Sequence, residues 1–369
     1  MTRAAPPEPS TFPSAPSLRR GWTTGTCASA AAAAAYQALL TGQFPDPVTV
    51  TLPRGGTTTL SLARALLEGE SAIAGVIKDA GDDPDVTHGA EIVAIVRRGP
   101  AGSGVGFRAG PGVGIVTLPG LPVAVGEPAI NPAPRAMIRA AILAVADQFD
   151  APGDVIVTLS IPGGEALAER TLNGRLGIQG GLSILGTTGV VVPFSCASWI
   201  HSIHRGIDVA RAAGLPHLAA ATGSTSEAAV QRLYGLPEVA LIDMGDFVGG
   251  TLKYLRTHPV PRFTIAGGFA KLVKLAQGHL FLHSSKSRVD MARLAADLAA
   301  LGAPSAAVIE AGSANTAMEV LAVAAGAGLP LADRIAAEAL AIAHGTLAGE
   351  TALEVVVFDR VGNLIGRAS

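Results

Sequence analysis

Cysteine and aromatic residues are scarce in this sequence. Its 369 residues include two cysteines, Cys27 and Cys196, which lie far apart in the chain. Two distant cysteines argue against a disulfide scaffold and predict a reducing, cytoplasmic environment. Aromatic residues make up only 4% of the chain. Few rings are therefore available to stack on nucleic-acid bases.

Charged residues are also few, at 15%, and the formal net charge is -2. Lysine and arginine are spread singly or in pairs and form no long basic run. This distribution argues against nucleic acid or an anionic membrane surface as a partner. It still suits an acidic small molecule held by a few well-placed arginines.

Long apolar runs are missing as well. The alanine run at residues 28–35 is short, and Asp333, Arg334 and Glu338 interrupt the apolar C-terminal stretch. Neither reaches the ~18–20 apolar residues of a membrane span. Residues 1–17 lack the apolar segment of a signal peptide, and we expect a disordered tail there. The apolar fraction of 49% and the chain length instead predict two domains with large cores.

Glycine, by contrast, is abundant, and residues 172–195 read LNGRLGIQGGLSILGTTGVVVPFS. Six glycines fall between Gly174 and Gly189 in this stretch. Glycine is used where the backbone needs positive φ or approaches another group closely. A glycine-rich loop that runs into an apolar strand suits a binding crevice, and it equally suits a domain connector. Composition leaves both interpretations open.

The first half of the chain predicts a mixed α+β domain over residues 18–171. Thr24 or Thr26 can cap a helix at residues 28–40, which Gly42 ends. The free N–H groups at such a helix start form either an anion site or an ordinary capped terminus. Short strands with turn residues between them predict a mixed or antiparallel sheet. These strands are expected at residues 48–52, 57–62, 71–78, 90–97 and 154–161, with helices at 130–148 and from about 164.

An acidic loop, KDAGDDPDVTHG, occupies residues 78–89. It contains four aspartates and His88, but not the spacing of a calcium-binding loop. Three interpretations stay open: a weak cation site, a solvated acidic turn, and charge that orients a basic group.

The second half alternates apolar strands with helices, which predicts a doubly wound, mostly parallel, Rossmann-like α/β domain over residues 190–369. Residues 172–189 are then a connecting or binding loop. Strands are expected at residues 190–194, 218–221, 239–242, 262–266, 306–310 and 353–358, and helices at 197–213, 228–234, 251–256, 270–275 and 288–301 with two more before the last strand. Ligands of such sheets bind beyond the carboxyl ends of the strands. Those ends carry Thr222-Gly223-Ser224, Asp243 to Asp246, and Gly267-Gly268.

Several common catalytic motifs are absent from the sequence. It contains no G-x-S-x-G, H-E-x-x-H, C-x-x-C or Walker motif. His201 and His204 have helical spacing, but no third metal ligand is apparent, so no protein metal site is predicted. Cys27 stands at a helix start, where it is either an activated thiol or a small packed residue.

Six segments together resemble the CbiD family. In chain order they are GWTTGTCASAAA, VIKDAGDDPDVTHGAEI, INPAPRAMI, IPGGEALAERTLNGRLGIQGGLSILGTTGVVVPFS, MGDFVG and GGFAKLVKLAQGHLFLHS. The resemblance runs from about Leu18 to the C-terminus. It implies transfer of a methyl group from S-adenosyl-L-methionine to C-1 of cobalt-precorrin-5B, giving cobalt-precorrin-6A in anaerobic cobalamin biosynthesis. The cobalt then arrives with the substrate.

This chemistry suggests roles for individual residues. The substrate carries many carboxylates, which arginine forks, lysines and helix starts can bind. Substrate-binding candidates are Thr23, Thr24, Thr26, Lys78, His88, Arg135, Arg175, Lys271 and His283. Donor-binding candidates are Gly186, Thr187, Thr188, Gly189, Thr222, Gly223, Ser224, Asp243 and Gly245, although the loop at residues 186–189 is left open between donor and corrinoid. Asp79, Asp83 and Asp246 are candidates to orient the donor's ammonium or to accept a proton.

Two other kinds of protein stay open: an enzyme acting on a phosphorylated metabolite, suggested by the Thr/Gly helix starts, and a non-catalytic corrinoid-binding protein. The sequence also leaves the oligomeric state open, a homo-oligomer included.

Overall fold

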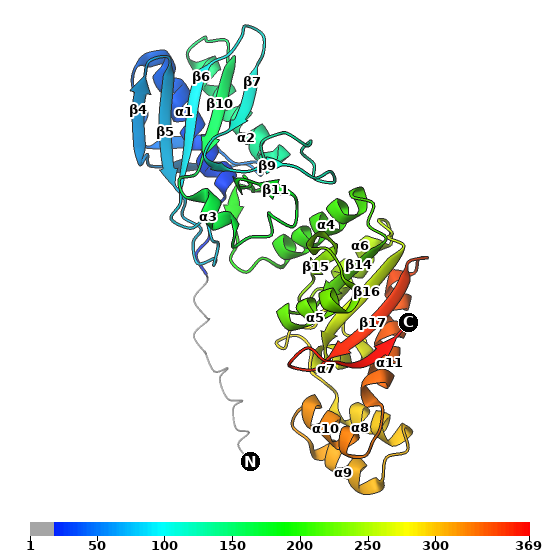
Figure 1. Ribbon diagram of the computed structural model, residues 1–369. Coiled ribbons are helices and arrows are strands. Elements are labelled where there is room, and N and C mark those ends of the chain that lie inside the picture. Colours follow the sequence, from blue (N-terminus) through cyan, green and yellow to red (C-terminus); the bar gives the residue numbers. More distant parts are fainter. Residues whose placement is uncertain (1–17) are drawn as a thin grey trace, which may run out of the picture. The chain divides into compact units, whose positions relative to one another are not determined.

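The computed structural model describes residues 18–369, which form two compact units (Figure 1). Unit 1 contains the described residues up to Arg108, together with Ala133–Pro162 and Ile184–Phe194. Unit 2 contains Ala109–Pro132, Gly163–Ser183 and Ser195–Ser369. The units are thus interleaved along the chain, whereas the sequence predicts consecutive domains. The expected tail, residues 1–17, lies outside the described residues.

Unit 1 is built on a five-stranded sheet of order β4-β5-β6-β10-β7, in which β4 pairs with β5, β5 with β6 and β6 with β10, all antiparallel. Its sheet strands are β4 (Arg64–Glu68), β5 (Ser71–Ile77), β6 (Glu91–Arg98), β7 (Val105–Ala109) and β10 (Val155–Ser160). A separate hairpin joins β2 (Val48–Thr51) to β3 (Thr57–Leu60), and β1 (Gly21–Trp22) pairs antiparallel with β13 (Val190–Val191). The helices are α1 (Thr24–Thr41) and α2 (Pro132–Gln148).

Helix α1 packs against β5 and β6 and supplies much of the core of unit 1. Alanine has the highest helix propensity, and its small side chain lets the helix lie close to the sheet. The run of alanines in α1 is buried almost completely. The Thr23 hydroxyl caps the start of the helix, and Gly42 ends it with φ of 80°.

Unit 2 contains a five-stranded sheet of order β15-β14-β16-β17-β18. The first four strands are parallel and β18 is an antiparallel edge, which confirms the mostly parallel α/β prediction. The strands are β14 (His217–Ala221), β15 (Leu241–Asp243), β16 (Arg262–Gly268), β17 (Ala352–Phe358) and β18 (Leu364–Ala368). Strands β16 and β17 are almost continuously buried, as expected for a sheet covered on both faces.

Helices cover both faces of this sheet (Figure 1). The larger core lies on the face of α4, α6, α7 and α11, and α5 covers the other face. The helices are α4 (Cys196–Ala212), α5 (Ser224–Tyr234), α6 (Val248–Leu255), α7 (Phe269–Ala276), α8 (Met291–Ala300), α9 (Ser305–Ser313), α10 (Ala317–Gly326) and α11 (Leu331–Leu347), with a 3-10 turn, η1, at Glu238–Ala240. Unit 2 also holds α3 (Gly164–Ala168) and the short strands β8 (Gly112–Val113), β9 (Ile115–Val116), β11 (Ile178–Gln179) and β12 (Gly181–Leu182).

The structure corrects two local predictions and adds strands that the sequence did not predict. The strand expected at residues 190–194 is only Val190–Val191, and it pairs with β1 in unit 1 instead of opening the parallel sheet. Pro193 follows it, and Phe194 has φ of 55°, outside the extended region. The strand expected at residues 306–310 is helical, within α9. Strands β4, β7 and β18 of the two five-stranded sheets were not predicted.

Candidate functional site

Three parallel strands end side by side in unit 2. Ala221 of β14 lies opposite Asp243 of β15 and Ala266 of β16. The Ala221 carbonyl accepts hydrogen bonds from the N–H groups of Met244 and Gly245, both at 3.1 Å. The sheet therefore brings the predicted residues 222–224, 243–246 and 267–268 to one edge.

Helix α5 begins at this edge, directly after β14. Its N-cap is Gly223, which has an extended conformation and provides no side-chain cap. The first N–H groups of a helix need external acceptors and carry the positive end of the helix dipole. The start of α5 can therefore accept a carboxylate or phosphate oxygen.

Asp243 is half-buried at the end of β15. Burial raises the pKa of its carboxyl group, the nearby Glu227 raises it further, and Arg175 acts in the opposite direction. Arg175 itself donates to both oxygens of Glu227, at 2.7 and 2.6 Å. Arg175 and Asp243 also line a cavity of about 20 Å³, which has room for about one water molecule. The predicted guanidinium is thus already held by a protein carboxylate.

A second ionic group of this edge comprises Asp246 and Lys271, which form an ion pair at the start of α7. Lys274, one turn further along, donates to the Leu282 carbonyl at 2.9 Å. The Leu282 N–H in turn donates to the Asp246 carbonyl at 2.9 Å. The exposed His283 follows directly, and its Nδ1 lies 2.8 Å from the Ser285 hydroxyl. The structure thus brings Asp246, Lys271 and His283 together.

In unit 1, the start of α1 meets the loop at residues 185–189. The Gly25 N–H donates to the Leu185 carbonyl at 2.9 Å, and the Thr26 hydroxyl donates to the Gly189 carbonyl at 2.7 Å. A Cβ on Gly186 would lie 2.3 Å from Thr23, so only glycine permits this approach. The predicted threonines are therefore buried under the predicted loop.

These hydrogen bonds occupy N–H and hydroxyl groups that would otherwise be available to bind an anion. The Thr23 hydroxyl accepts from the Thr26 N–H at 3.3 Å, and Thr23, Thr24 and Thr26 are all buried. In the loop, Thr187 is exposed, and the Thr188 hydroxyl donates to the Val190 carbonyl at 3.0 Å. Neighbouring Cys27 is fully buried, which raises its pKa to about 12. Cys27 is thus a packed residue and not an activated thiol.

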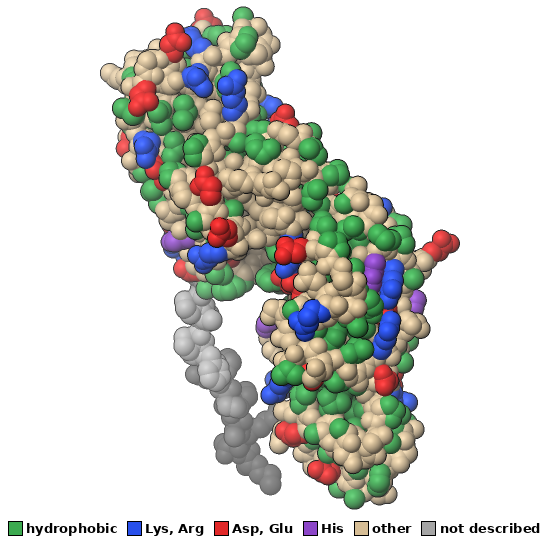
Figure 2. All heavy atoms as spheres, viewed as in Figure 1, with side chains coloured by type: hydrophobic (Ala, Val, Ile, Leu, Met, Phe, Trp, Pro, Cys, Tyr) green, Lys and Arg blue, Asp and Glu red, His purple; other side chains and the backbone are tan. Residues whose placement is uncertain are grey.

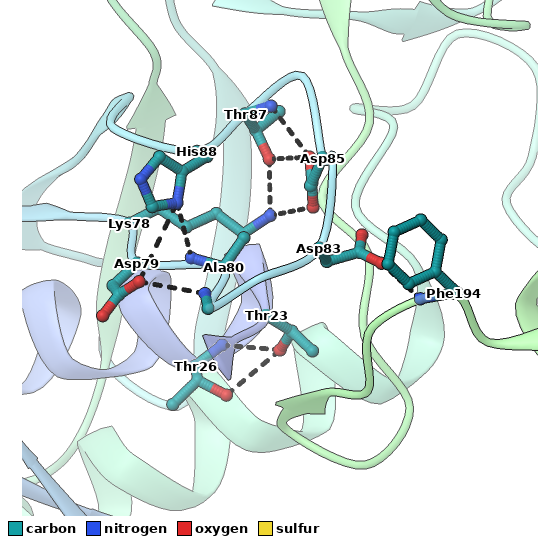
Figure 3. Close-up of polar contacts among 11 residues, drawn as sticks. Thr23, Thr26, Lys78, Asp79, Ala80, Asp83, Asp85, Thr87, His88 and Phe194 are labelled. Carbon is teal, nitrogen blue, oxygen red and sulfur yellow. Dashed lines mark hydrogen bonds and ion pairs between the residues drawn. The ribbon is translucent and has the colours of Figure 1, made fainter. Parts of the chain in front are cut away.

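The acidic loop of unit 1 is organised around Lys78 (Figure 3). The Lys78 side chain is only 2% exposed, and its ammonium contacts the Asp85 carboxylate and the Thr87 hydroxyl. Asp85 also accepts from the Thr87 N–H at 2.8 Å. The pKa of Asp85 is lowered because the lysine charge and these hydrogen bonds outweigh the opposing effect of burial. Lys78 is therefore an internal counter-ion that shapes the loop.

The remaining acids of this loop are partly or fully exposed. Asp79 pairs with Arg19 and accepts from the Gly81 N–H at 2.9 Å, and these hydrogen bonds lower its pKa to about 2. His88 Nδ1 accepts from the Ala80 N–H at 3.1 Å. Asp83 accepts from the Phe194 N–H at 2.8 Å and so attaches the segment after β13 to the loop (Figure 3).

Arg135 lies on α2, where its guanidinium is 5.3 Å from the centre of the Phe107 ring. On the face seen in Figure 2, the Lys and Arg side chains of residues 18–369 are dispersed among acidic and apolar groups and do not form a continuous basic surface. Within the same residues, no cluster of His, Cys, Asp and Glu could hold a metal ion. None of the helices described is long and apolar enough to cross a membrane.

The predicted residues thus form one group in unit 1 and another in unit 2. Trp199 of α4, whose indole N–H donates to the Asp243 carbonyl at 3.3 Å, is not among the residues predicted from the sequence. Glu227, the partner of Arg175, is not among them either. The only available signal for Trp199 was its rarity, since the chain has two tryptophans.

Known proteins resemble this chain over nearly its whole length. The family models described as "CbiD" and "CbiD, C-terminal domain" match residues 12–193 and 281–369. A cobalt-precorrin-5B C(1)-methyltransferase of a Bradyrhizobium species is 62% identical over 95% of this chain and 93% of its own. The enzyme of the same name from Methylorubrum extorquens is 60% identical over 94% and 97%.

Among solved structures, the crystal structure of the cobalamin biosynthesis protein (cbiD) from Archaeoglobus fulgidus is 30% identical, with a TM-score of 0.40, and covers 70% of this chain and 79% of its own. The matches to these curated relatives cover 94–95% of the chain and therefore include residues of both units. The chain belongs to the CbiD family.

Proposed function

We propose that this protein transfers a methyl group from S-adenosyl-L-methionine to C-1 of cobalt-precorrin-5B and so forms cobalt-precorrin-6A. One observation carries the proposal: relatives that bear the name cobalt-precorrin-5B C(1)-methyltransferase are about 60% identical over nearly the entire chain. The cobalt ion belongs to the substrate, so the reaction requires no metal site in the protein.

The reaction is a displacement at the methyl carbon. The C–S bond of the sulfonium breaks, a C–C bond to the ring forms, and S-adenosylhomocysteine leaves with the electron pair of the broken bond. The electron-rich ring supplies the new bonding pair, so the protein needs no strong nucleophile. Holding both reactants in line is the main contribution of the protein, and such positioning is worth up to ~7–11 kcal/mol of the barrier.

We place the donor at the carboxyl edge of the sheet in unit 2. The uncapped start of α5, at Thr222, Gly223 and Ser224, suits the donor's carboxylate. The Asp243 carboxylate suits the ribose hydroxyls or the positive charges of the donor. A bound cation or hydroxyl donor would also offset the burial that raises the pKa of Asp243.

The carboxylates of the corrinoid need cations. Lys271 and His283 are accessible in unit 2, and Arg135 is the corresponding candidate in unit 1. Lys78 is not included, because its ammonium is buried against Asp85. Arg175 is a candidate for this binding only together with its ion-pair partner Glu227.

A proton released during the reaction needs an acceptor, and Asp83 and Asp246 are the candidates. Asp79 is less suitable because a group with a pKa of about 2 is a weak base at neutral pH. Full turnover of an Asp83→Asn variant, with normal affinity for both ligands, would remove Asp83 from this role.

Mass spectrometry tests the proposal directly. The protein is incubated with cobalt-precorrin-5B and S-adenosyl-L-methionine whose methyl group is deuterated. We expect the corrinoid to gain one deuterated methyl group, which carbon-13 labelling and NMR would locate at C-1. Tight corrinoid binding without methylation would support a non-catalytic carrier instead. Competition by inorganic phosphate, without binding of S-adenosylhomocysteine, would support an enzyme of phosphorylated metabolites that uses the start of α5.

A further inference from the structure

Aromatic side chains gather at the carboxyl edge of the sheet in unit 2. The centre of the Phe247 ring lies 6.3 Å from that of Trp199 and 5.0 Å from that of Phe281. The His283 ring follows at 6.0 Å from Phe281, in a nearly parallel orientation. In a chain with only 4% aromatic residues, this row is a marked local concentration.

The first ring of the row is fixed in place but partly open to solvent. The Trp199 indole N–H donates to the Asp243 carbonyl at 3.3 Å. A Cβ built on Gly245 would lie 3.6 Å from the same indole, so the loop after β15 lies against the ring. Trp199 is nevertheless 47% exposed. An indole that is held by the protein and still accessible is suited to stack on a flat ligand.

On the basis of the methyl transfer proposed above, we propose that the open part of Trp199 binds the adenine ring of S-adenosyl-L-methionine. A purine and an indole are both flat bicyclic systems of similar size, and every base offers a π-face for stacking. The order of the groups along the edge also fits one extended donor. The start of α5 would meet the carboxylate, Asp243 the central ribose, and Trp199 the adenine.

Charge favours the donor over the corrinoid at this position. Asp243, whose backbone carbonyl accepts the Trp199 indole N–H, also carries a half-buried carboxylate at this edge, which would repel a substrate rich in carboxylates but attract a sulfonium. The lysines of this edge, Lys271 and Lys274, lie beside the segment that carries Phe281 and His283. That end of the row therefore suits the carboxylates of the corrinoid.

Tryptophan fluorescence gives a direct test. The only other tryptophan is Trp22, so a Trp22→Phe variant reports on Trp199 alone. We expect S-adenosylhomocysteine to quench this emission in a saturable manner. By calorimetry, Trp199→Ala should bind S-adenosylhomocysteine roughly tenfold more weakly, in the range expected for loss of one base–aromatic stack. Trp199→Phe should retain most of the affinity because a ring remains.

Ile309→Ala is the matched control, since Ile309 is a 73% exposed apolar residue on α9. It should bind S-adenosylhomocysteine like the wild type. Wild-type affinity of Trp199→Ala for S-adenosylhomocysteine, or loss of its corrinoid affinity alone, would overturn the assignment of adenine to Trp199. Methyl transfer by the wild-type protein would leave the proposed function standing in that case. If the wild type neither methylates the corrinoid nor binds S-adenosylhomocysteine, the proposed function fails as well. A Trp199→Ala variant that does not fold leaves the fluorescence titration and Trp199→Phe to decide.

Discussion

The parallel sheet in unit 2 has a carboxyl group with a lowered pKa at one end and a carboxyl group with a raised pKa at the other. Toward the amino ends of the strands, Glu354 of β17 is 2% exposed. It accepts hydrogen bonds from Tyr234 at 2.7 Å, Thr264 at 2.8 Å and Arg262 at 2.9 Å. Arg367 donates to its other oxygen at 2.6 Å. Burial alone would raise the pKa of Glu354, but these hydrogen bonds lower it to about 2.

At the carboxyl end, Asp243 is half-buried and its pKa is raised, first by burial and then by Glu227. The protein thus stabilises the charge of Glu354 fully and disfavours that of Asp243. A carboxylate whose charge is satisfied internally contributes to folding. A carboxylate whose charge is disfavoured in the folded protein is available to a ligand that stabilises this charge. The uncapped start of α5 and the open Trp199 are at the same end as Asp243.

The largest effect that tests this comparison is expected at Glu354. Glu354→Gln removes the negative charge that two arginines share and weakens the acceptor of the buried Thr264 hydroxyl. We expect a loss of about 3 kcal/mol in the free energy of unfolding, because several hydrogen bonds to a charged acceptor are weakened, although the two arginines remain partly solvated. Urea unfolding at neutral pH measures this loss, and affinity for S-adenosylhomocysteine should not change.

The pH dependence provides a control for the same variant. The folded-state pKa of Glu354, about 2, lies below the ordinary value of 4.5. Its stabilising contribution is therefore complete above about pH 4.5 and is lost as the pH falls toward about 2. Wild-type stability should decline across this range more steeply than that of Glu354→Gln. Parallel curves would show that Glu354 is not the satisfied carboxylate described above.

Lys78 of unit 1 allows a second test of the same principle. Lys78→Met retains the apolar part of the buried side chain but leaves Asp85 without its counter-ion. We expect a loss of about 2 kcal/mol in the free energy of unfolding. This loss is smaller than for a fully buried ion pair because the Asp85 side chain is 25% exposed. Arg19→Ala, which breaks the exposed pair with Asp79, should change the urea midpoint much less. Equal losses in the two variants would contradict an internal role for Lys78.

Much of this fold is predictable from the sequence, because periodicity and turn chemistry are local. The alternation from residue 190 onward predicts the parallel strands of unit 2, although its first expected strand, residues 190–194, belongs to unit 1. The alanine run predicts α1. Residues 306–310 are ambiguous because a short apolar run suits a buried strand and a helix equally. The pairing of β13 with β1 depends on contacts more than 160 residues apart in the sequence, which no local pattern contains.

The candidate site is predictable only in part. The rule that ligands bind beyond the carboxyl ends of parallel strands places Asp243 and Ser224 without a structure. The burial of Lys78 is not visible in the sequence, since lysine is rarely buried. The role of Trp199 depends on the direction of one indole N–H toward the Asp243 carbonyl. Only the three-dimensional structure supplies that direction.

The smallest effect on stability, and the one that separates the two ends most clearly, is expected for Asp243→Asn. A raised folded-state pKa means that the folded state holds the proton more tightly than the unfolded state, so Asp243 contributes less to stability as the pH rises through this pKa. The neutral amide removes that penalty, and stability at neutral pH should be unchanged or slightly higher. Binding of S-adenosyl-L-methionine should weaken roughly tenfold, as expected for loss of one charge-assisted contact of about 1.4 kcal/mol. Urea unfolding and calorimetry on the same preparation measure both quantities. A clear loss of stability with unchanged donor affinity would place Asp243 in the same class as Glu354.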